Sequence, residues 1–131
     1  MYLIDTDILV FALRGHPRVA ENIGACLDVP AAMSVISYGE LLYGAARSRY
    51  AREDIEKVRE FARGFRIVDV TPSVMETFAS LRAALERAGR RIDDMDLIIA
   101  ATAVIQGAVL VSNNEDHFRR VPGLSVENWT K

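Results

Sequence analysis

The sequence has little cysteine and no long apolar run. Cys26 is the only cysteine among 131 residues, so the chain forms neither an internal disulfide nor a cysteine-based zinc cage. Such scarcity is typical of a reducing compartment, and we expect a cytoplasmic protein. The longest apolar stretch, Leu97 to Val111, contains polar residues and is shorter than the about 20 residues that a membrane span needs. The early acids Asp5 and Asp7 do not fit a secretory signal, so we expect no contact with a membrane.

Several sequence patterns of known enzyme classes are also missing. The chain has no Gly-x-Ser-x-Gly, no Gly-Lys-Ser/Thr and no Gly-x-Gly-x-x-Gly, which excludes the common serine-hydrolase, P-loop and dinucleotide-binding motifs. The two histidines, His16 and His117, are not at metal-ligand spacing. We expect His16 in a solvated turn and His117 on the surface of a helix, with lining of a site as the alternative for His117.

The basic residues are nearly all of one kind. Lys57 and Lys131 are the only lysines among 16 basic residues, although the net charge is −2. Arginine carries a planar fork of donors that matches two phosphate oxygens at once, whereas lysine is a point charge. Two explanations stay open at this point, namely local phosphate binding and the arginine codons of a GC-rich genome.

Short apolar segments alternate with amphipathic ones along the whole chain. We expect strands at Tyr2–Ile4, Ala31–Val35, Arg66–Val70, Val109–Val111 and Leu124–Glu127. We expect helices at Asp7–Leu13, from Pro17 to about Asp28, from an N-cap at Ser37, at Arg52–Ala62, from Thr71 to about Ala88, and from about Met95 to Gln106. Strands separated by helices imply parallel pairing through crossovers. The prediction is a single α/β domain over residues 1–131, with three α/β/α layers and a central parallel sheet of four to five short strands.

Polar residues follow two of the expected strands. Asp5 comes directly after the first strand, and Asn114 follows the strand that ends at Val111. In parallel α/β sheets the functional site lies beyond the carboxyl ends of the strands. Asp5 is then either a helix N-cap or a site acid. Glu40, three residues after Ser37, is either the partner in a capping box or a second site acid.

The densest acidic cluster consists of Asp93, Asp94 and Asp96. One carboxylate satisfies a helix N-terminus, but three within four residues repel one another unless a cation lies nearby. The residues after Asp96 are apolar on nearly every side, so Asp96 begins a buried helix, where an unpaired charge is costly. Further along the chain, Asn114 and Asp116 offer an amide oxygen and a carboxylate, or they form an Asx turn. Together these hard oxygen ligands favour Mg²⁺ or Mn²⁺ over zinc.

Four segments in this order resemble the PIN-domain nucleases and, more narrowly, the VapC toxins of VapB–VapC toxin–antitoxin pairs. The segments are Asp5-Thr6-Asp7, Ser37-Tyr38-Gly39-Glu40-Leu41-Leu42-Tyr43-Gly44, Asp96-Leu97-Ile98-Ile99-Ala100-Ala101, and Val111-Ser112-Asn113-Asn114 followed by Phe118. The resemblance implies that the catalytic residues are Asp5, Glu40, Asp96 and Asn114. It implies metal ligation by Asp5, Asp96 and Glu40.

Some positions depart from the family pattern or stand beside it. Asn114 occupies the place where many PIN domains have a fourth acid, so the fourth ligand is either its amide oxygen or Asp116 acting through water. Thr6 and Ser112 match hydroxyl positions that orient the acids or the substrate. Asp93 and Asp94 stand where Gly or Pro is more frequent and are assigned accessory roles.

The resemblance also implies a function. The expected activity is Mg²⁺-dependent endoribonuclease cleavage, in which metal-activated water hydrolyses phosphodiesters of RNA such as tRNA or rRNA. The expected partners are a VapB-type antitoxin and a second copy of the chain, in a homodimer and a toxin–antitoxin hetero-oligomer. Segments Tyr38–Ala46 and Arg52–Ala62 supply either an apolar groove for the antitoxin or part of the core. The alternatives are a PIN nuclease of RNA maturation or decay without an antitoxin, and a metal-dependent phosphatase.

Overall fold

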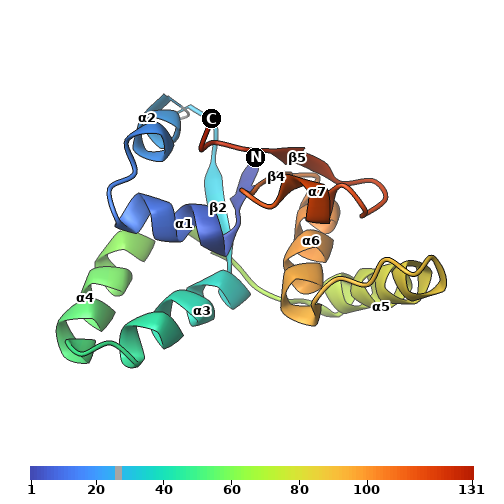
Figure 1. Cartoon of the computed structure of the whole chain (residues 1–131), viewed down its shortest axis with the longest axis horizontal. Helices are drawn as coiled ribbons and strands as arrows, with labels where there is room; N and C mark the ends of the chain where they lie inside the picture. Colours follow the sequence, from blue (N-terminus) through green and yellow to red (C-terminus); the bar gives the residue numbers. More distant parts are fainter. Residues whose placement is uncertain (26–27) are drawn as a thin grey trace.

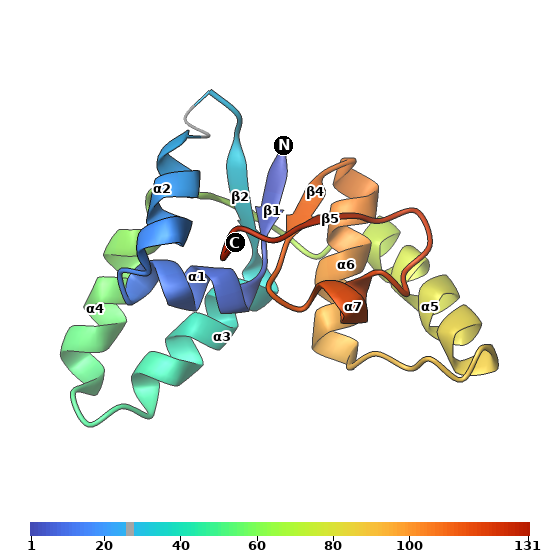
Figure 2. The same ribbon diagram turned by 45° about the horizontal axis from the view of Figure 1, so that its top comes forward.

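The computed structural model describes residues 1–25 and 28–131. Cys26 lies outside this part, and so does a section of the helix that we expected to reach Asp28. Within the described residues, five strands pair in parallel in the order β3-β2-β1-β4-β5, and Figure 2 shows β1 between β2 and β4. The strands are β1 (Tyr2–Ile4), β2 (Ala31–Ser34), β3 (Arg66–Val68), β4 (Val109–Val111) and β5 (Ser125–Glu127). The five expected strands are therefore confirmed, with ends that differ by up to two residues.

Helices cover both faces of the sheet. The helices are α1 (Thr6–Leu13), α2 (Pro17–Ala25), α3 (Val35–Ala46), α4 (Ala51–Ala62), α5 (Pro72–Arg87), α6 (Asp94–Gln106) and α7 (Glu115–Phe118). Helices α1 to α4 lie on one side of the molecule, and α5 and α6 lie on the other (Figure 1). The expected three-layer α/β/α architecture is confirmed.

Alternating side chains of the central strands build the two halves of the core. Leu3 and Leu110 pack with residues of α5 and α6, whereas Ile4 and Val111 pack with residues of α1, α2 and α4. This division follows from the strand period of two, which sends neighbouring side chains to opposite faces. Because both faces are covered, the side chains of β1 and β4 are apolar on both faces of the sheet.

The start of α3 differs from the prediction. The helix begins at Val35, and the N-cap is Ser34, whose Oγ accepts the backbone N–H of Ile36 at 3.1 Å. The predicted N-cap at Ser37, with Glu40 as its capping-box partner, is wrong. Ser37 is fully buried inside the helix. The apolar pair Val35 and Ile36 suits a strand or a helix equally, and only the packing of the first turn decides between them.

The carboxyl end of β1 is fixed by its neighbour β4. The two strands pair Ile4 with Val111, and the backbone N–H of Asp5 then donates to the carbonyl of Val111 at 2.8 Å. The ladder therefore extends one residue beyond β1 and holds Asp5 at the edge of the sheet. None of the helices in the described part of the chain is long and apolar enough to cross a membrane.

Candidate metal and catalytic site

Asp5 is the most enclosed acid of the site, with 5% of its surface exposed. One carboxylate oxygen accepts the N–H of Thr6 at 2.8 Å, and the other accepts the hydroxyl of Ser112 at 2.8 Å. Burial, followed by the charge of Asp7, raises the pKa of Asp5 from 3.8 to about 7 against the lowering effect of these hydrogen bonds. Asp5 is thus both the N-cap of α1 and a carboxylate held at fixed orientation, so the two interpretations of this residue are compatible.

Asp7 joins this group, although we had not assigned it a role in the site. One of its oxygens accepts the N–H of Ile8 at 2.7 Å, and the other accepts the N–H of Asn113 at 3.1 Å. Burial raises the pKa of Asp7, while those two hydrogen bonds and one to Asp5 lower it. Asp7 therefore links α1 to the loop after β4. The signal in the sequence is the Asp5-Thr6-Asp7 segment, in which we assigned Asp7 to the start of a helix and gave it no role in the site.

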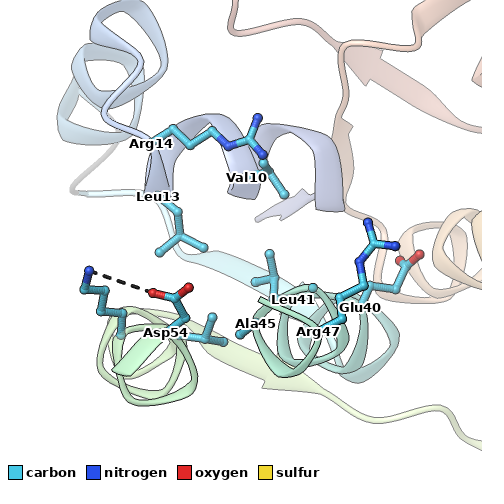
Figure 3. Close-up of a pocket in the computed structure, with 11 residues that line it drawn as sticks. Val10, Leu13, Arg14, Glu40, Leu41, Ala45, Arg47 and Asp54 are labelled. Atoms are coloured by element: carbon cyan, nitrogen blue, oxygen red, sulfur yellow. Dashed lines mark ion pairs between the residues drawn. The ribbon is translucent and has the colours of Figure 1, made fainter. Parts of the chain in front are cut away.

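Glu40 reaches the same edge of the sheet from α3. The Thr6 hydroxyl donates to Glu40 Oε1 at 2.7 Å and lies 2.9 Å from the hydroxyl oxygen of Ser37. The backbone of Thr6 binds Asp5, so this one residue connects both acids. Its predicted orienting role is consistent with these contacts. Glu40 also lines a groove between α1, α3 and α4, where Figure 3 shows its carboxylate at one end.

Asp96 lies in the first turn of α6, and His117 of α7 stands beside it. The distance from His117 Nε2 to Asp96 Oδ2 is 3.5 Å. Burial raises the pKa of Asp96, His117 lowers it, and the charges of Asp93 and Asp7 add to the increase. His117 Nε2 is buried and has no hydrogen-bond partner among the described residues. His117 lies on helix α7 with 21% of its side chain exposed, and its position beside Asp96 agrees with the alternative that it lines the site.

The structure does not bring Asp116 to the group of acids. Its side chain is 97% exposed and forms an ion pair with Arg119 at 3.3 Å. Residues two apart on a helix point about 200° apart, so burial of Phe118 directs Asp116 towards solvent. Asn114 is also exposed, and its contact with the site is made by its backbone N–H, which donates to the Ser112 hydroxyl at 3.0 Å.

The two remaining acids differ in position. Asp94 pairs with Arg82 of α5 at 3.3 Å, which ties α6 to α5, and its other oxygen is buried with no partner in the described part of the chain. Asp93 occupies the N-cap position of α6 without a side-chain capping bond. It is exposed, and its charge acts on Asp96.

The donor chemistry of the site fits a divalent cation. Among residues 1–25 and 28–131, no set of three or more His, Cys, Asp or Glu side chains is close enough to form a complete metal cage. Mg²⁺, however, is usually bound through one or two carboxylates and keeps several waters. Asp5 and Asp96 are hard oxygen donors whose charges act on each other at the sheet edge. These two side chains could hold the ion, with Asp7 and Glu40 reaching it through water.

Comparison with known proteins places the chain in a family. Residues 2–124 match the family described as PIN domain. The chain belongs to the PIN domain family. This PIN domain is 35% identical to ribonuclease VapC2 of Rickettsia felis, over 100% of this chain and 99% of that protein. It is 27% identical to the tRNA(fMet)-specific endonuclease VapC of Shigella flexneri, over 98% of each. A crystal structure of VapBC2 from Rickettsia felis, bound to a DNA fragment from their promoter, matches with a TM-score of 0.92 at 33% identity and covers 98% of both chains.

The raised pKa of Asp5 makes a prediction about stability. Because the folded value of about 7 exceeds 3.8, the stabilisation by protonated Asp5 is complete below pH 3.8 and is lost as the pH rises through about 7. The Asp5→Asn variant should not lose stability in this way, because an asparagine side chain cannot ionise. Without metal, the free energy of unfolding of Asp5→Asn minus that of the wild type should increase by about 2–3 kcal/mol as the pH rises from about 5 to about 8. Urea unfolding in EDTA measures it, with exposed Asp116→Asn as the control. Parallel pH curves for wild type and Asp5→Asn would contradict the assignment.

The contact between His117 and Asp96 makes a second prediction. A side chain that contacts a ligating carboxylate, as His117 contacts Asp96 at 3.5 Å, helps to orient it, and the loss of such a neighbour lowers metal affinity about 10- to 100-fold. His117→Leu should therefore weaken Mg²⁺ binding by about that factor, and His117→Gln, which keeps a side-chain N–H, should restore most of it. Calorimetric titration of the PIN domain with Mg²⁺ measures the affinities, and His16→Gln, in the turn between α1 and α2, is the control. Equal affinity in wild type and His117→Leu would contradict this role.

Proposed function

We propose that this PIN domain is a Mg²⁺-dependent endoribonuclease that acts as the toxin of a toxin–antitoxin pair, with Mn²⁺ as the alternative ion. The observation that carries the proposal is the placement of three acids: the charge of Asp96, in the first turn of α6, acts on Asp5 at the N-cap of α1, and Thr6 connects Asp5 to Glu40 of α3. Burial is the largest cause that raises the pKa of both Asp5 and Asp96, and repulsion from nearby carboxylates adds to the increase: Asp7 and Asp96 act on Asp5, and Asp93 and Asp7 act on Asp96. A divalent cation relieves this repulsion, which supports metal-dependent chemistry at this edge.

Each residue of the site has a separate role in the proposed cleavage of an RNA phosphodiester. A bound Mg²⁺ supplies an activated water and neutralises charge on the scissile phosphate. Asp5 and Asp96 would hold the ion, and Thr6 and Ser112 fix the orientation of Asp5. Glu40, held by the Thr6 hydroxyl, orients the attacking water. Asn114 supports Asp5 through its N–H on Ser112, which leaves its amide side chain available to the substrate.

The accessory acids have separate roles in this proposal. Asp93 adds negative charge beside Asp96, and Asp94 anchors the start of α6 through Arg82. Asp116 is left out of the ligand set because its carboxylate is exposed and paired with Arg119.

RNA is the proposed substrate class, and a structured RNA such as tRNA or rRNA is the narrower proposal. The names of the Rickettsia felis ribonuclease and the Shigella flexneri tRNA(fMet)-specific endonuclease support it. Neither the nuclease without an antitoxin nor the phosphatase, the two alternatives suggested by the sequence, is favoured by these similarities.

The decisive experiment removes one acid at a time. Asp5→Ala and Asp96→Ala should each lower Mg²⁺-dependent RNA cleavage by at least about 100-fold, because metal chemistry contributes several kcal/mol to such reactions. Sequencing the 5′ ends of RNA treated with purified protein, with Mg²⁺ and with EDTA, measures the cleavage. Asp116→Ala is the matched control and should cleave as the wild type does. Full activity of either site variant, or of the wild type in EDTA, would refute the proposal.

An antitoxin of the VapB type is the proposed partner, in addition to a second copy of the chain in a homodimer and hetero-oligomer. The similar VapBC structure from Rickettsia felis supports this partner. A groove of about 410 Å³ between α1, α3 and α4 could receive an antitoxin segment. Leu13 and Leu41 give it apolar walls, while Arg14 and Arg47 lie at its rim (Figure 3). A segment in this groove would reach Glu40 and so block the site.

This partnership predicts a phenotype in cells. Expression of the wild type alone should arrest growth, and expression together with the small protein encoded beside it should restore growth. Leu13, which is 36% exposed in the groove, can be changed without emptying the core. Leu13→Asp should weaken co-purification of that partner by about 10-fold or more, since an unpaired charge in an apolar contact is costly, while RNA cleavage persists. Normal growth with the wild type alone would count against a toxin.

A further inference from the structure

Helix α3 carries an exposed ring and a cation next to Glu40. Tyr43 and Arg47 follow Glu40 at intervals of three and four residues, which places the three side chains on one side of the helix. Tyr43 is 66% exposed, and the guanidinium carbon of Arg47 lies 5.4 Å from the centre of its ring. Arg47 forms no ion pair within the described part of the chain. Figure 3 shows Glu40 and Arg47 projecting from α3 to the same side.

The ring of Tyr43 lies at the edge of an open pocket that begins at the proposed site. The pocket has a volume of about 470 Å³, and its walls include Glu40, Tyr43 and Met95. Met95 directly precedes Asp96, so the pocket connects two of the acid-bearing elements. Its volume is in the range of about 300–1,000 Å³ that small ligands occupy. A planar base has room here beside the acids.

Two glycines leave this side of α3 open. Gly39 and Gly44 lie within the helix, where glycine is less favourable than alanine. A Cβ at either position would meet nothing within 4 Å, so packing within the chain does not require glycine there. The open surface beside Glu40 and Tyr43 is thus available to a molecule from outside.

We propose that Tyr43 and Arg47 form a subsite for the nucleotide next to the scissile phosphate. The ring of Tyr43 stacks on the base, and the guanidinium of Arg47 binds the adjoining phosphate. RNA continues beyond the phosphate being cleaved. The surface that begins at Glu40 offers it an aromatic ring and then a guanidinium that no acid of the described residues pairs with. This inference rests on the proposed ribonuclease function.

The chain contains a matched pair that lies elsewhere. Arg49 lies over Tyr50 at 5.8 Å, and Tyr50 is 61% exposed. Tyr50 is the N-cap residue of α4 and lines neither of the two pockets that contain Glu40. Tyr50 and Arg49 therefore form a second tyrosine–arginine pair outside the proposed nucleotide subsite.

The test compares the two pairs. Fluorescence anisotropy with a short labelled single-stranded RNA of mixed sequence, in EDTA, measures binding without cleavage. Tyr43→Ala should weaken binding by about 5- to 150-fold, the contribution of stacking one base. Tyr43→Trp should restore it, and Tyr50→Ala should bind as the wild type does. Arg47→Ala should reduce the slope of log affinity against log salt by about 0.7, the value for one phosphate contact to a single strand, whereas Arg49→Ala should not.

The outcomes separate this inference from the proposed function. In Mg²⁺, Tyr43→Ala should raise KM and leave kcat nearly unchanged, since stacking beside the scissile bond is uniform binding. Equal binding by Tyr43→Ala, Tyr50→Ala and the wild type overturns the subsite but leaves the nuclease intact. Loss of a dimer in sedimentation, with unchanged RNA binding, also overturns it and assigns this surface to a second copy of the chain. Absence of both RNA binding and cleavage in the wild type refutes the proposed function itself.

Discussion

The site depends on one buried carboxylate at the end of the central strand. Asp5 is held by a backbone amide from its own helix and by the hydroxyl of Ser112 in the loop after β4, at a sequence separation of 107 residues. Burial favours the protonated form, while the two donors favour the charged form. The fold thus contains a buried carboxylate whose charged form is destabilising without a cation and is oriented to bind one. The pairing of β1 with β4 must form before this balance exists.

The other acids are connected to Asp5 through hydroxyls and amides. The Thr6 hydroxyl donates to Glu40. The Ser112 hydroxyl accepts the backbone N–H of Asn114, and the Asp7 carboxylate accepts that of Asn113. Asp96 is the exception, because the side chain in contact with its carboxylate is His117 of α7. Small uncharged groups therefore hold the acids at set positions without neutralising them, which leaves the charge for a cation.

Much of the architecture could be predicted from local pattern. Short apolar runs such as Tyr2–Ile4 and Val109–Val111, separated by amphipathic segments, indicate the parallel sheet, and Asp5 directly after the first run marks its carboxyl edge. Predictions that depended on tertiary packing were less accurate. The start of α3 was assigned to Ser37 because a serine with a glutamate three residues later suits a cap, yet Ser34 occupies that position. The open alternatives for His117 and Asp116 could not be decided from the sequence. Burial of Phe118 sets the orientation of α7, which places His117 beside Asp96 and directs Asp116 towards solvent. No short sequence window contains that information.

The distance along the chain between Asp5 and Ser112 has a consequence for synthesis in the cell. The ribosome makes the N-terminal strand first and the segment with β4 and Ser112 late, so a growing chain lacks both the partner strand of Asp5 and its hydroxyl donor. A nascent or truncated copy without this last part keeps the Thr6 contacts to Asp5 and Glu40, but it lacks the Ser112 hydroxyl and the β4 pairing that fix Asp5 at the sheet edge. The complete site can therefore assemble only after synthesis has passed β4 and Ser112.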